Sequence, residues 1–234
     1  MQVVTNEARA RGEQRKGNWL LIGAMLVYLA GFGQAWLVPA NPLSDALSIA
    51  GLVVGTALWL LSQTYIRRVG ARYRQDAPLE RALKGLDNRY TLVNFADREL
   101  PDHLLVGPGG VRVLVARGLA GRVRCQRDRW SRPGAVGWLD VVSTDHLGNP
   151  AADATRGVAQ VTRRLERALD AEPAGALVTA SIVFTNPKAV LEIDGSHYPV
   201  TRGRDLRAHI QRDKGSLRPP EVARLRQALE PAAR

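Results

Sequence analysis

The chain has 234 residues, a formal net charge of +11 and a single cysteine, Cys125. One cysteine excludes a disulfide within the chain, and the scattered histidines give no pair with zinc-ligand spacing. Arginine supplies most of the positive charge, since only four lysines are present. Such a composition fits either GC-rich coding bias or contact with the phosphates of lipid or nucleic acid.

Two uncharged apolar segments lie near the N-terminus. Residues 19–38 read WLLIGAMLVYLAGFGQAWLV and residues 46–65 read ALSIAGLVVGTALWLLSQTY. A helix of about 20 such residues spans a bilayer core of roughly 30 Å. A cleaved signal peptide is the alternative for the first segment, but its apolar core is too long and a second segment follows at once. We therefore expect two transmembrane helices, over residues 19–38 and 46–66.

The charges around these segments predict their orientation. Basic residues precede the first segment and follow the second, whereas the connection PANPLSD carries none. The basic residues are Arg9, Arg11, Arg15, Lys16, Arg67, Arg68, Arg72 and Arg74. Positive residues concentrate on the cytoplasmic side of a membrane, so both flanks should face the cytoplasm from the inner membrane. Gly51 and Gly55 match a small-xxx-small pattern, which we expect to serve packing within the hairpin rather than a dimer.

The soluble part begins with a helix and an antiparallel hairpin. Asp76-Ala-Pro78 is typical of a helix start, and the apolar stripe that follows ends before Asp87. Strands are expected over residues 90–95, 103–106 and 111–116. The turn Gly107-Pro-Gly-Gly110 joins the last two, because proline presets φ and glycine permits positive φ.

Strands and helices alternate in the remaining sequence. Asn149-Pro150 is typical of a capped helix start, with proline in the first turn. Strands are expected over residues 121–126, 138–142, 177–184 and 198–200, and further helices from Asp205 and from Pro219. This order predicts an α/β fold with a mixed central sheet flanked by helices, preceded by the two-helix transmembrane hairpin.

The expected domain organisation follows from these elements. The segments are a basic cytoplasmic tail (1–18), transmembrane helix 1 (19–38), an external loop (39–45), transmembrane helix 2 (46–66), a basic linker (67–76), the α/β domain (77–212) and a C-terminal helical tail (213–234).

Several blocks of the soluble part resemble the nuclease-related domain (NERD) family, which has the restriction-endonuclease-like PD-(D/E)XK fold. The blocks are Leu79-Glu80, the run LPDHLLVGPGGV over residues 100–111, Gly121-Arg-Val-Arg, Trp130, Asn149-Pro150 and Ser181-Ile-Val-Phe184. They cover about 130 residues in the family's order, and the Asp-His…Gly-Pro-Gly-Gly-Val block is the most specific of them.

The resemblance implies metal-dependent cleavage of phosphodiester bonds. Asp102 and Glu80 correspond to two of the family's acids, which would hold Mg²⁺ in an active enzyme. The expected Glu-x-Lys falls on Val115-Ala-Arg117. Valine cannot bind a metal, and arginine stays protonated, although its planar fork can hold a phosphate. We therefore expect a degenerate nuclease fold, unless Asp140 or Glu80 takes the missing role.

Plainer roles remain open for these residues. Asp102 could cap a turn, Glu80 could be an ordinary first-turn acid of a helix, and Arg117 could be solvated.

A cluster of arginines surrounds Trp130. The cluster consists of Arg112, Arg117, Arg122, Arg124, Arg127, Arg129 and Arg132. Arg122 and Arg124 should share one strand face, and Trp130 could stack on a base or a guanidinium group. Three interpretations remain: a solvated sheet face, a nucleic-acid groove, or a surface for anionic lipid.

Three functions are consistent with the sequence. The first is a membrane-anchored NERD-like protein that binds nucleic acid or another phosphate-rich partner without cutting it, and needs no cofactor. The second is an active Mg²⁺-dependent DNA nuclease. The third is a membrane-bound scaffold for protein interactions.

Overall fold

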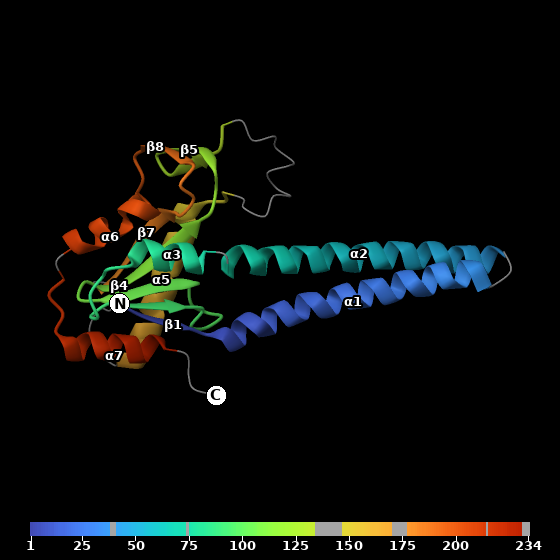
Figure 1. The fold of residues 1–234 in the computed structure, drawn as a ribbon, viewed down its shortest axis with the longest axis horizontal. Helices are drawn as coiled ribbons and strands as arrows, with labels where there is room; N and C mark the ends of the chain where they lie inside the picture. Colours follow the sequence, from blue (N-terminus) through green and yellow to red (C-terminus); the bar gives the residue numbers. More distant parts are fainter. Residues whose placement is uncertain (38–40, 74, 134–146, 170–176, 214, 231–234) are drawn as a thin grey trace. The chain divides into compact units, whose positions relative to one another are not determined.

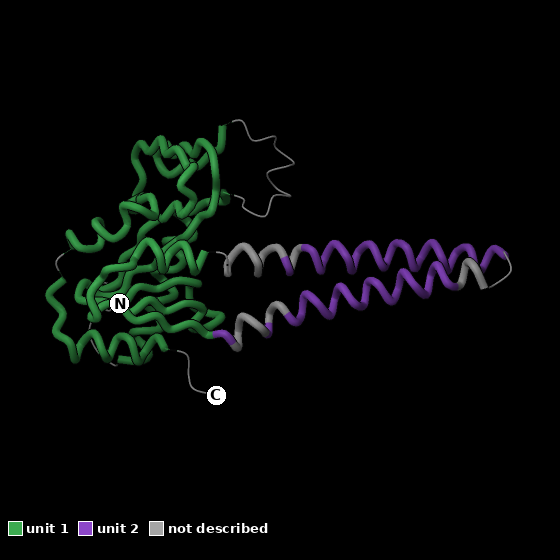
Figure 2. The backbone as a smooth tube through the Cα atoms, in the orientation of Figure 1, with its two compact units in different colours: residues 1–6, 74–234 green, residues 7–73 purple. Residues whose placement is uncertain are grey.

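The computed structural model describes residues 1–37, 41–73, 75–133, 147–169, 177–213 and 215–230. The chain divides into two compact units (Figure 2): unit 1 consists of residues 1–6 and 74–234, and unit 2 of residues 7–73. The strand expected over residues 138–142, including Asp140, lies outside the described residues.

Unit 2 is a pair of long helices, α1 (Glu7–Leu37) and α2 (Pro42–Tyr73), which run side by side (Figure 1). Small and polar side chains make the contacts between them. Gly31 and Gly51 meet backbone to backbone, as a Cβ built on Gly51 would lie 3.5 Å from the Cα of Gly31. The hydroxyls of Tyr28 and Thr56 are 3.0 Å apart. The expected packing of small residues within this pair is confirmed for Gly51.

The outward surface of the helical pair is apolar. The exposed large side chains include Trp19, Ile22, Met25, Leu26, Leu29 and Phe32 on α1, and Leu43, Leu47, Ile49, Leu52, Val53, Val54, Trp59, Leu60 and Leu61 on α2. Residues Pro42–Gln63 are long and apolar enough to cross a membrane. We expected a loop over residues 39–45, but α2 already begins at Pro42. The first turn of α2 is held by Asn41, whose side-chain oxygen accepts a hydrogen bond from the Ser44 amide at 2.8 Å.

Unit 1 is built on a six-stranded mixed sheet in the order β1-β2-β3-β4-β7-β9, so the expected mixed α/β architecture is confirmed. The strands are β1 (Gln2–Thr5), β2 (Thr91–Asn94), β3 (His103–Gly107), β4 (Gly110–Arg117), β7 (Val178–Phe184) and β9 (Val200–Arg202). β2, β3 and β4 are antiparallel, whereas β1 is parallel to β2, and β4, β7 and β9 are mutually parallel.

Helices cover both faces of this sheet. They are α3 (Asp76–Leu83), α5 (Pro150–Leu169), α6 (Gly203–Arg212) and α7 (Pro219–Leu229). α5 and α7 pack on the face that carries Val113 and Ile182, while α3 and α6 pack on the face that carries Leu105 and Leu114. Alternate residues of each strand thus supply two separate hydrophobic cores.

The turn between β3 and β4 confirms the hairpin expected from Gly107-Pro-Gly-Gly110. Gly110 has φ +93°, and a Cβ there would lie 2.2 Å from the carbonyl oxygen of Leu177. Only glycine fits, because the turn needs a left-handed backbone and the neighbouring chain leaves no room for a side chain.

A second, three-stranded sheet has the order β6-β5-β8. Its strands are β5 (Gly121–Gln126), β6 (Arg129–Ser131) and β8 (Ala189–Asp194). Val123 and Cys125 of β5 are buried, while the residues between them are exposed. β5 was expected from its alternation, whereas β6 and β8 were not.

The two ends of the chain differ from the expected tails. Residues 2–5 form β1 rather than part of a basic tail, and β1 pairs with β2 from Gln2↔Thr91 to Thr5↔Asn94. The segment over residues 213–234 is not separate from the domain, because Leu225 and Leu229 of α7 are buried in the larger core. Unit 1 thus contains the chain on both sides of the helical pair, residues 1–6 before α1 and residues 74–234 after α2.

Candidate phosphate-binding site

The expected nuclease residues come from three elements of unit 1. Asp102 directly precedes β3, Glu80 lies on α3, and Val115 and Arg117 lie near the end of β4. β3 and β4 pair at Leu104↔Val113. Continuing this antiparallel register by two residues brings Asp102 opposite Val115. The position at which the resemblance implies a carboxylate, Val115, would thus face Asp102.

Val115 has an apolar side chain, which cannot take the role of the acid that the resemblance implies at this position. Its side chain is 7 % exposed and packs in the larger core. A carboxylate at this position would have to be desolvated against apolar neighbours, which is costly without a bound cation.

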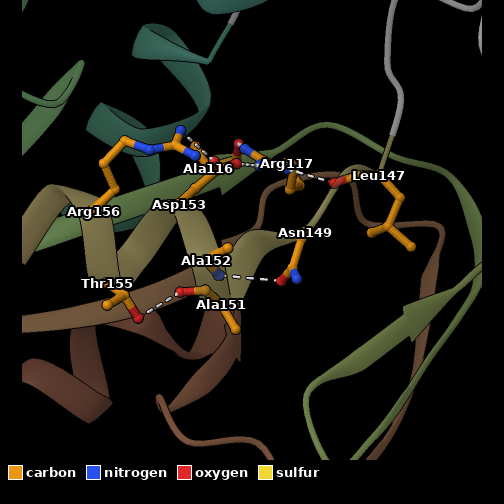
Figure 3. A network of polar contacts seen from close by, with 9 residues as sticks. All are labelled: Ala116, Arg117, Leu147, Asn149, Ala151, Ala152, Asp153, Thr155 and Arg156. Carbon is orange, nitrogen blue, oxygen red and sulfur yellow. Dashed lines mark hydrogen bonds and ion pairs between the residues drawn. The ribbon is translucent and has the colours of Figure 1, made fainter.

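Arg117 is held by an internal polar network (Figure 3). Its Nη2 donates to the Asp153 carboxylate at 2.5 Å, its Nε to the Leu147 carbonyl at 3.1 Å, and its Nη1 to the Ala116 carbonyl at 3.1 Å. Arg156 contacts the other oxygen of Asp153 at 3.2 Å. All three guanidinium nitrogens are occupied, and Asp153 offsets the charge, so Arg117 is poorly placed to clamp an external phosphate.

The helix that supplies Asp153 begins as the sequence predicts. The Asn149 side-chain oxygen accepts from the Ala152 amide at 3.1 Å, and Pro150 is the first residue of α5. This cap fixes the first turn of α5 and thereby places Asp153 beside Arg117.

Glu80 and Asp102 lie near a third acid that the sequence analysis did not single out. Burial raises the pKa of Asp76 to about 7, with further contributions from the negative charges of Glu80 and Asp102. Within the described residues, however, no three His, Cys, Asp or Glu side chains converge closely enough to hold a metal ion. Asp76, Glu80 and Asp102 thus do not converge as a metal site requires in the described part of the chain, and the magnesium site that the resemblance implies stays a prediction.

His103 and Asn94 form a buried polar pair beside Asp76. Burial lowers the pKa of His103 to about 3, so the imidazole is neutral. Its Nδ1 lies 3.0 Å from the Asn94 side-chain oxygen and 3.5 Å from a carboxylate oxygen of Asp76. The Asn94 amide donates to the Thr5 hydroxyl at 3.3 Å. The network joins Thr5, which precedes α1, to Asp76, which follows α2, and local sequence patterns carry no signal for it.

The arginine cluster separates into several environments. Arg112 is largely buried, pairs with Asp213 and donates to the Ser181 hydroxyl at 2.9 Å. Arg132 donates to the Ala120 carbonyl. Arg127 occupies the β5–β6 turn with φ +48° and is exposed. These arginines and Arg117 do not share one surface.

Three arginines of the cluster do share a face, the outer surface of the second sheet. The register pairs Gln126 with Arg129 and Arg124 with Ser131, so Arg122, Arg124 and Arg129 point to the same exposed side. Arg122 and Arg124 both contact Glu192 of β8, at 3.1 and 2.8 Å. We call Arg122, Arg124 and Arg129 the basic face. The shared Glu192 lowers its charge but leaves it positive among these residues.

Trp130 lies on the other side of this sheet. Its ring stacks on Phe184 with centroids 6.1 Å apart, and its indole nitrogen is buried without a hydrogen-bond partner among the described residues. The indole packs against the larger core. This position does not favour the expected role of Trp130 as a platform for bases.

Comparisons with known proteins provide no relative of this chain. No family model matches it, and neither the curated proteins nor the solved structures contain a match.

Proposed function

We propose that this protein is a membrane-anchored, NERD-like domain that binds nucleic acid through the basic face without cutting it. The carrying observation is the combination of a three-arginine exposed face with Val115 and Arg117 at the positions where a nuclease needs a metal ligand and a lysine. Phosphate contacts supply most of the sequence-independent affinity for nucleic acid, and they require exposed cations rather than a metal site.

The anchoring part of the proposal rests on the surface of unit 2. Large apolar side chains point outward, while Tyr28, Thr56 and Ser62 make hydrogen bonds between or within the helices. Water would disfavour this arrangement, whereas a bilayer favours it. We infer that α1 crosses the membrane together with α2, as a hairpin.

The strand β1 supports the same topology. It precedes α1 and pairs with β2, while α3 follows α2 and packs in the smaller core of the same unit. A chain that leaves unit 1 and returns to it must cross the membrane an even number of times. The basic residues at both flanks favour a cytoplasmic location for unit 1 by the positive-inside rule.

The test is nucleic-acid binding by the full chain in detergent micelles, measured across a range of salt concentrations. We expect affinity to fall steeply with salt, and the triple variant Arg122→Ala/Arg124→Ala/Arg129→Ala to lower the slope of log K against log salt by about 3. The matched control replaces three exposed arginines outside the basic face, Arg98, Arg163 and Arg224.

The control should leave the slope closer to wild type than the triple variant does. Equal losses in the two variants would show that only net charge matters and would remove the basic face from the proposal. No binding by the wild-type chain at low salt would remove nucleic-acid binding altogether.

A further inference from the structure

An open cavity of about 500 Å³ lies in unit 1, and none of its described lining residues belongs to the basic face. It sits where three parallel strands end: Gly118 follows β4, Thr185 follows β7, and Gly203 follows β9. Pro78, Arg81 and Ala82 of α3, and Gln75 directly before it, also line the cavity. The carboxyl ends of parallel strands are a recurrent place for ligand binding in α/β sheets, and the volume suits a small ligand.

The charged groups that line this cavity are both cationic. Arg81 and Arg204 are exposed, and the described residues that line the cavity include no Asp or Glu. Arg204 forms an ion pair with Asp205, whose carboxylate oxygen lies 3.6 Å from the Arg204 Nε, and both side chains are more than half exposed. A pair this exposed is strongly screened by solvent, so Arg204 keeps most of its capacity for another anion.

The side-chain oxygens of the walls are engaged within the protein, as are some donors, since the Asn186 side-chain amide donates to the Gly118 carbonyl at 3.0 Å. The Gln75 side-chain oxygen accepts from the Thr185 hydroxyl at 2.5 Å, and the Asn186 side-chain oxygen accepts from the Lys188 amide at 2.9 Å. Arg81 donates through Nε to the Ala77 carbonyl at 3.2 Å, and its two Nη groups have no recorded partner in the described part of the chain. The free hydrogen-bonding capacity of the walls is therefore mainly N–H, which selects an acceptor-rich, negatively charged ligand.

We propose that this cavity binds a phosphate group, held by the guanidinium groups of Arg81 and Arg204. Arginine matches the geometry of phosphate oxygens through paired N–H donors. The cavity is distinct from the basic face, and this assignment does not depend on nucleic-acid binding.

Two sources can present the same chemical group. Gln75, which lines the cavity, is two residues beyond Tyr73, the last residue of α2. With α2 in a membrane, as proposed above, an anionic lipid headgroup is one source. A soluble phosphate ester is the other.

The experiment compares the wild-type chain, Arg81→Ala/Arg204→Ala, and the control Arg163→Ala/Arg224→Ala, which removes the same charge from exposed positions on α5 and α7. In the soluble arm, calorimetry measures binding of glycerol phosphate to the full chain in uncharged detergent. In the lipid arm, the chain is placed in phosphatidylcholine nanodiscs with and without phosphatidic acid, and the thermal shift produced by that lipid is measured.

If a phosphate ester is the ligand, we expect the cavity variant to bind glycerol phosphate about tenfold or more weakly than the control does. If a lipid headgroup is the ligand, we expect the cavity variant to lose the thermal shift that phosphatidic acid produces in the control. A response in the soluble arm identifies a phosphate ester, and a response in the lipid arm alone identifies a headgroup. Absence of wild-type binding in both arms, or equal responses of the two variants, would overturn the proposal. Unchanged thermal unfolding without ligand verifies that the variants fold, and retained nucleic-acid binding by the cavity variant separates this site from the basic face.

Discussion

At the scale of single residues, two buried groups should make stability depend on pH. Burial lowers the pKa of His103, so its contribution to stability rises with pH up to about 6.5. The carboxyl group of Asp76 acts in the opposite direction, and its effect extends to neutral pH. Burial raises its pKa from the usual 3.8 to about 7, so the folded state holds a proton that the unfolded state releases between these values. Stability attributable to Asp76 is therefore full below about pH 4 and falls as the pH rises toward 7.

We expect Asp76→Asn to remove this pH dependence, because the amide keeps the shape of the side chain and carries no charge. At pH 8 the variant should be more stable than wild type by about 1–2 kcal/mol, a figure reduced for the partial exposure of the group. Thermal unfolding in detergent from pH 5 to 8 measures the effect, with the exposed Glu166→Gln as control. If the stability of the Asp76→Asn variant depends on pH as the wild type's does, Asp76 is not the source of that dependence.

At the scale of elements, the β3–β4 hairpin provides a prediction with a matched control. Gly110→Ala places a Cβ at 2.2 Å from the Leu177 carbonyl oxygen and strains a residue with φ +93°. We expect a loss of about 2–4 kcal/mol of unfolding free energy. Gly109→Ala meets nothing within 4 Å, so it should cost much less in the same denaturant titration. Similar losses in both variants would contradict this account of the turn.

The edge strand β1 offers a second contrast between neighbouring residues. The amide of Gln2 donates to the carbonyl of Tyr90, directly before β2, and the amide of Asn6 donates to the carbonyl of Asn94 in β2. By alternation, the Val4 amide also points toward β2. Val4→Pro should break this pairing and lower the midpoint of thermal unfolding. Val3→Pro, whose missing amide would face away from β2, should be tolerated better. If Val3→Pro is the more damaging change, the register of β1 described here is wrong.

At the scale of the whole molecule, the membrane topology can be tested by cysteine labelling of intact cells. The native Cys125 is buried, which keeps the background low. We expect a membrane-impermeant maleimide added outside to label Asn41→Cys, in the connection between α1 and α2, and to leave Arg98→Cys unlabelled until the membrane is opened. Labelling of both from outside, or of Arg98→Cys alone, would rule out the proposed orientation.

Features that depend only on neighbouring residues could be predicted from the amino-acid sequence. The Asn149-Pro150 cap, the Gly107–Gly110 turn and the alternation of Gly121–Gln126 each act within a few residues, and the structure contains all three elements. The apolar run at 46–65 is likewise local, because its composition alone makes Pro42–Gln63 long and apolar enough to cross a membrane.

The contacts between residues far apart in the sequence could not be predicted and are seen only in the folded chain. Gln2 pairs with Thr91, Arg117 with Asp153, and the Trp130 ring with Phe184. A guanidinium group or an indole ring has the same local signature whether it faces solvent or another side chain. The functional environment of these residues is fixed by long-range packing and charge pairing, which no periodicity in the sequence encodes.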